Sequence, residues 1–129
     1  MNAHDPAVIA WVRKAENDWK AIRACLHGSD PPWDAVCFHA QQAAEKFLKA
    51  FLVAHRVVPP RVHDLVKLLT LCADHDPWLS ALEPDCGLLT NFTLIRYPDI
   101  LEPDAPTGQT AVAAAERICD AIRQRLSMP

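Results

Sequence analysis

The feature that most constrains the fold of this chain is the segment from Trp33 to His55, the longest stretch without the helix-breaking residues glycine and proline. Placed on a helix at about 100° per residue, it separates into an apolar and a polar face. The apolar face carries Val36, Ala40, Ala43, Phe47, Ala50, Phe51 and Ala54. Its alanines allow neighbouring helices to approach closely. We therefore predict the central helix of a bundle, with Asp34 as its N-cap.

A row of polar side chains lies on the opposite face of this helix. It consists of His39, Gln42, Lys46 and Lys49, with Gln41 and Glu45 beside it. One interpretation is an ordinary solvated face, because charged residues usually stay exposed. The other is a face that is partly covered, since Phe38, Leu52 and Val53 project from the same side. Apolar residues in such a place suggest contact with a second subunit.

Three further segments carry apolar residues at helical spacing. The first begins with Asp5 as N-cap and Pro6 in the first turn, and it is predicted to stop at Gly28, which can adopt the left-handed conformation. Another helix is expected over residues 61–72, and the last over residues 109–126.

The region between these last two helices is less regular. Over residues 78–96 we expect one helical turn, a kink caused by Pro84 and Gly87, and a firmer helix from about Asp85. Residues 97–109 are rich in proline and are predicted to form the longest loop. Loops of this length are uncommon in compact domains unless they are functional or mobile.

Length and composition favour one folded domain. The 129 residues are 50% apolar, which suits a single core spanning residues 1–129. No segment alternates as a strand would, so the predicted fold is an all-α, up-and-down bundle of about five helices. The net charge of −3 argues against a broad nucleic-acid-binding surface but leaves a local basic groove possible.

The residue pattern gives no indication of a metal, a cofactor or a membrane anchor. The five cysteines form no C-x-x-C pair, which predicts buried, reduced thiols in a cytoplasmic protein. Asp74, His75 and Asp76 are better explained as a solvated turn than as metal ligands. The chain has no glycine-rich phosphate loop. No apolar run approaches the ~20 residues that span a bilayer, so a soluble protein is expected.

The sequence Arg96-Tyr97-Pro98-Asp99 is the clearest candidate site. An arginine followed by an aromatic residue and a proline presents a rigid fork of donors from a turn whose φ is fixed. This chemistry suits a phosphate or a carboxylate. A local ion pair between Arg96 and Asp99, or an interaction with the helix dipole, explains the pattern equally well. His63-Asp64 is expected in the first turn of its helix, with a capping and packing role.

Several stretches together resemble the HEPN domain family, in the branch often encoded beside minimal nucleotidyltransferases. They are Ala15-Glu16-Asn17-Asp18-Trp19, the run from Phe38 to Ala50 with the pattern H-x-x-Q-x-A-x-E-K-x-x-K-A, His63-Asp64-Leu65, and Arg96-Tyr97-Pro98-Asp99. The resemblance extends from about Trp11 to Leu126. It implies a helical bundle that commonly forms a homodimer.

The resemblance also implies two opposing functions. Many HEPN proteins are metal-independent ribonucleases, whose motif is an arginine followed after four to six residues by a histidine. Arg96 is present here, but no histidine follows it. The branch with Arg-Tyr-Pro looks more like a domain that binds a nucleotide or a nucleotidyltransferase.

We therefore expect a non-catalytic homodimer that acts with a nucleotidyltransferase in a toxin–antitoxin-like module and binds a nucleotide or RNA. The candidate binding residues are Arg96, Tyr97, Asp99, His39, Gln42, Lys46 and Lys49. No catalytic residue is assigned. One alternative is an endoribonuclease that uses Arg96 with a relocated histidine, for which His39 or His63 would have to lie near Arg96. The other is a dimeric helical scaffold without a ligand.

Overall fold

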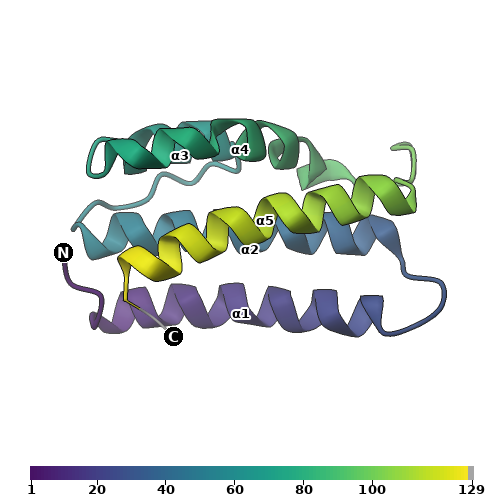
Figure 1. Ribbon diagram of the computed structural model, residues 1–129, viewed down its shortest axis with the longest axis horizontal. Coiled ribbons are helices and arrows are strands. Elements are labelled where there is room, and N and C mark those ends of the chain that lie inside the picture. The colour runs from purple at the N-terminus through teal and green to yellow at the C-terminus, as the bar shows by residue number, and fades with distance from the viewer. Residues whose placement is uncertain (128–129) are drawn as a thin grey trace.

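The long segment without glycine or proline forms the central helix of the bundle. In the computed structural model, which describes residues 1–127, this helix is α2 (Trp33–Ala54). It packs against α1 (Pro6–Leu26), α5 (Ala105–Arg125) and α3 (Leu65–Ala73). Figure 1 shows α1 on one side, α2 and α5 in the middle, and α3 with α4 (Glu83–Leu89) on the other side. The described residues form no strand, so the predicted all-α fold with five α-helices is confirmed.

The core lies around α2 because this helix supplies its largest buried side chains. Phe47 is completely buried, and Phe51 is 1% exposed. The first turn of α5 comes very close to the start of α2: a Cβ added to Gly108 would lie 2.1 Å from Cε3 of Trp33. Glycine therefore fits at this contact, and a larger residue would displace the indole ring.

The structure corrects three predicted helix starts, and side-chain caps set two of them. The prediction of Asp34 as the N-cap of α2 was wrong: the helix begins at Trp33, after Pro32 and without a side-chain cap, so Asp34 lies in its first turn. The helix α3 begins at Leu65, because the Asp64 carboxylate accepts the backbone N–H groups of residues 66 and 67 at 3.0 and 3.2 Å. The helix α5 begins at Ala105, since Asp104 accepts the N–H of Thr107 at 2.9 Å.

The predicted helical turn followed by a helix from about Asp85 is present, but the α-helix ends at Leu89 and does not continue to Arg96. The region contains a 3₁₀-helix, η1 (Pro77–Leu82), then the short α4, and a second 3₁₀-helix, η2 (Thr90–Leu94). Pro84 lies in the first turn of α4, where its missing N–H breaks no helical hydrogen bond. The predicted left-handed Gly28 was also wrong, since no glycine within residues 1–127 has a positive φ.

The polar row of α2 is not an ordinary solvated face. Gln41 is fully buried, and Glu45 and Lys49 are only 4% and 7% exposed. Leu52 is fully buried within a single chain, and Phe38 and Val53 are half-buried. The apolar side chains on this face therefore give no argument for a second subunit, because the chain covers them itself.

All five cysteines are free thiols, and four of them are buried. Burial raises the pKa of the Cys37 thiol to about 11 and that of Cys72, Cys86 and Cys119 to about 12.

No helix in the described part of the chain is both long and apolar enough to cross a membrane.

The buried thiols should be unreactive in the folded protein, because the thiolate is the nucleophile and little of it forms near neutral pH. We expect iodoacetamide at pH 8 to modify only the half-buried Cys25 in the native protein and all five cysteines in denaturant. Mass spectrometry of the intact protein measures the number of adducts. Rapid native modification of more than one thiol would contradict the buried positions.

Candidate functional site

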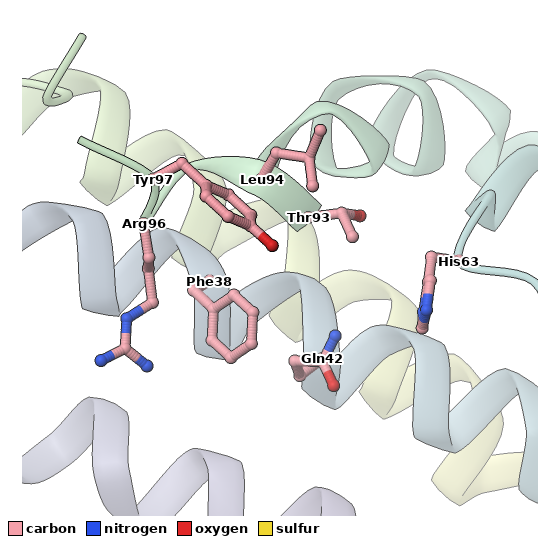
Figure 2. Close-up of a pocket in the computed structure, with 7 residues that line it drawn as sticks. All are labelled: Phe38, Gln42, His63, Thr93, Leu94, Arg96 and Tyr97. Atoms are coloured by element: carbon pink, nitrogen blue, oxygen red, sulfur yellow. The ribbon is translucent and has the colours of Figure 1, made fainter. Parts of the chain in front are cut away.

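An open cleft of about 480 Å³ lies between α2 and the segment that follows α4. The central helix contributes Phe38 and Gln42, and the residues before α3 contribute His63. The opposite wall is formed by Thr93, Leu94, Arg96 and Tyr97. In Figure 2, Arg96 and His63 lie at opposite ends of this cleft, with Phe38 and Gln42 between them.

Arg96 is exposed and stacks on an aromatic ring. Its guanidinium carbon lies 5.3 Å from the centroid of the Phe38 ring, a cation–π arrangement that orients the side chain while leaving its N–H donors accessible. No ion pair joins Arg96 to Asp99 within residues 1–127, so the local ion pair considered from the sequence is not formed. The guanidinium can therefore receive an anion.

At the other end of the cleft, a buried carboxylate orients His63. The Nδ1–H of His63 donates a hydrogen bond to Oε1 of Glu45 at 2.9 Å. The other ring nitrogen, Nε2, takes no part in this bond. Glu45 also accepts from Lys49 at 3.1 Å and from the amide of Gln41 at 3.1 Å. The His63 side chain is 62% exposed, whereas that of Glu45 is 5% exposed. The cleft thus has an accessible imidazole on a buried, hydrogen-bonded support.

A second buried carboxylate joins α1 to α2. Asp18, which is 6% exposed, accepts from Nδ1 of His39 at 2.8 Å and from Nζ of Lys46 at 2.6 Å. His39 and Lys46 retain exposed fractions of 25% and 22% in their side chains. These two residues therefore stabilise the contact between the helices, and they do not line the cleft.

The structure brings together only part of the predicted site. Arg96, Tyr97 and Gln42 line the cleft, whereas Lys49 is buried against Glu45. Asp99 is exposed on the loop and is not part of the lining.

Four lining residues were missing from the sequence-based site: Phe38, His63, Thr93 and Leu94. The sequence His63-Asp64-Leu65 was the available signal for His63. Asp64 has the predicted capping role, but it caps the helix from outside, because α3 begins at Leu65.

Comparison with known proteins assigns the fold to a family. The sequence model of the HEPN domain matches residues 8–125. The chain belongs to the HEPN domain family. Its structure is similar to the crystal structure of ST0689, an archaeal HEPN homologue, with a TM-score of 0.69 and 26% sequence identity. The similarity covers 92% of this chain and 97% of ST0689. A comparison with curated proteins gave no match.

The geometry shows what the motif in α2 does in this HEPN domain. Of its polar residues, His39 and Lys46 bind Asp18, while Glu45 binds Lys49 and His63. Buried charges are tolerated when they are paired and hydrogen-bonded in this way. Most of the motif therefore stabilises the packing of α2, and the chemistry of the cleft depends on Arg96, His63 and the neutral groups between them.

Proposed function

We propose that this HEPN domain protein binds a nucleotide or RNA through a phosphate at Arg96 and does not cleave it. The observation that carries the proposal is the exposed guanidinium on Phe38 at the end of a cleft. Arginine binds phosphate through a planar fork of N–H donors, and such charge-assisted bonds are among the stronger hydrogen bonds in proteins. The cleft also offers the Tyr97 ring for stacking and the Gln42 amide for a base edge.

Replacing Arg96 tests this function directly. We expect Arg96→Ala to weaken binding of a mixed-sequence RNA tetranucleotide about 10- to 100-fold, since a hydrogen bond to a charged group contributes about 1.5–3 kcal/mol. Isothermal titration calorimetry measures the affinity. Arg13→Ala is the matched control, because Arg13 is exposed on α1 and lies outside the cleft. Equal affinities of both variants and the wild type would contradict the proposal.

We extend the proposal to partners, in line with the family resemblance: a homodimer that acts with a minimal nucleotidyltransferase in a toxin–antitoxin-like module. Exposed apolar side chains of residues 94–101, two of which also line the cleft, support a protein contact. Leu94, Tyr97 and Leu101 are 57%, 61% and 91% exposed. Large apolar side chains that gather on a surface often mark an interface. Sedimentation equilibrium measures the mass in solution of the wild type and of Leu101→Asp. We expect the wild type to form a homodimer and the added charge of Leu101→Asp to weaken it.

One observation favours a second candidate function, metal-independent cleavage of RNA. The cleft contains His63 as well as Arg96, and Glu45 orients the imidazole. In such a reaction a histidine would accept the proton of the attacking 2′-hydroxyl, and an arginine would stabilise the charge on the phosphate. Binding remains the first proposal, because Arg96 and His63 lie at opposite ends of the cleft (Figure 2).

Incubation of mixed RNA in excess chelator separates the two functions. We expect intact RNA with the wild type. Cleavage that is lost in both Arg96→Ala and His63→Ala would replace the binding proposal by the ribonuclease. Cleavage that survives in both variants would indicate a contaminating nuclease.

A further inference from the structure

A second hollow adjoins the cleft, and His63 lies between the two. This hollow, of about 520 Å³, is lined on its far side by Asp64, Thr90, Asn91 and Ile100. It shares His63, Thr93 and Leu94 with the cleft that contains Arg96. The cleft and the second hollow therefore form one groove. From here on we call the cleft the Arg96 hollow and the second hollow the Asn91 hollow.

The two hollows differ in charge. The Arg96 hollow holds a cation that suits a phosphate. Apart from His63, which both hollows share, the only acidic or basic side chain of the Asn91 hollow is the Asp64 carboxylate, which already accepts N–H groups at the start of α3. A second phosphate would be repelled there. A neutral group is the better occupant of the Asn91 hollow.

The remaining lining of the Asn91 hollow suits a nucleobase. Leu94 and Ile100 are 57% and 40% exposed and offer apolar surface to the face of a flat ring. Asn91 is exposed, and its amide carries both donors and an acceptor, as recognition of a base edge requires. Single-stranded RNA is bound in this manner, by stacking of unpaired bases and by hydrogen bonds to their edges.

We infer that the ligand is single-stranded RNA of at least two nucleotides. This inference rests on the proposed binding of phosphate by Arg96. It spans both hollows, with a backbone phosphate at Arg96 and a neighbouring base in the Asn91 hollow. A mononucleotide would occupy the Arg96 hollow alone. His63 lies beneath the connection between the two nucleotides.

The test compares ligands of different length. The ligands are an equimolar mixture of the four nucleoside monophosphates and mixed-sequence pools of RNA dinucleotides and tetranucleotides, each titrated calorimetrically. We expect the tetranucleotide pool to bind the wild type at least about tenfold more tightly than the mononucleotides, because a further stacked base adds affinity. Asn91→Asp keeps the shape of the side chain but adds a negative charge. It should remove most of this gain and change mononucleotide affinity less than about twofold.

The control is Asn17→Asp, which makes the same charge change at an exposed position on α1. It should leave unchanged the tighter binding of the tetranucleotide pool relative to the mononucleotides. Equal affinity for mononucleotides and tetranucleotides, or equal effects of the two variants, would overturn the extended ligand while leaving phosphate binding at Arg96 in place. Absence of binding by any pool to the wild type would overturn both the inference and the proposed function, and would leave the groove as a surface for contact with a protein.

Discussion

Glu45→Ala is expected to lower the free energy of unfolding by about 3–5 kcal/mol, the usual cost of removing one partner from a buried ion pair. The Glu45 carboxylate is the common acceptor of Lys49, Gln41 and His63. Without it the ammonium of Lys49, whose side chain is 8% exposed, stays buried with no counter-ion. Lys49 also lies 5.6 Å from the Trp11 ring, so its displacement would disturb the contact between α1 and α2.

Urea denaturation followed by circular dichroism measures this loss. Asp120→Ala is the control, because Asp120 pairs with Arg123 at the surface and its side chain is 64% exposed. Such a pair contributes less than about 1 kcal/mol. The double variant Glu45→Ala/Lys49→Met should be more stable than Glu45→Ala, since it removes the unpaired charge. A loss no larger than that of the control would show that the buried pair has little role in stability.

Phe47→Ala should destabilise the fold by a similar amount, about 3–5 kcal/mol, because it removes a large buried side chain and leaves a cavity. Phe47 is completely buried in the middle of α2. Its ring also lies 4.7 Å from the guanidinium carbon of Arg123, which forms an ion pair with Glu16 of α1. The phenyl ring therefore packs beneath the contact that joins α1 to α5.

The matched variant Phe47→Leu keeps most of the volume and should cost about 1 kcal/mol. Thermal and urea unfolding of both variants give the comparison. A difference of less than about 1 kcal/mol between alanine and leucine at this position would mean that the surrounding helices close the cavity.

The expected loss at Glu45 affects how loss-of-function variants in α2 are interpreted. The polar pattern that carries the family resemblance mostly pairs charges inside the bundle, as in the contacts of Asp18 with His39 and Lys46. A variant at these positions would reduce binding through instability. Arg96 is exposed and has no partner carboxylate among the described residues, so its replacement tests binding with little effect on folding.

The sequence by itself determined the helical fold and the central position of α2, because helical periodicity and capping are local properties of the chain. It also predicted Asp5 as the first cap and Arg96 as an anion-binding candidate. Boundaries were less accurate at the starts of α2 and α5: α2 begins after Pro32 without a side-chain cap, and α5 begins directly after its cap, Asp104.

Only the tertiary structure decided how the polar side chains pair. Spacing along α2 places His39, Glu45 and Lys49 near the same face, but their partners Asp18 and His63 come from segments far away in the chain. Whether a charged residue is solvated or buried depends on what packs above it, and periodicity carries no such information. The approach of His63 to the cleft of Arg96 likewise arises because α2 supports both.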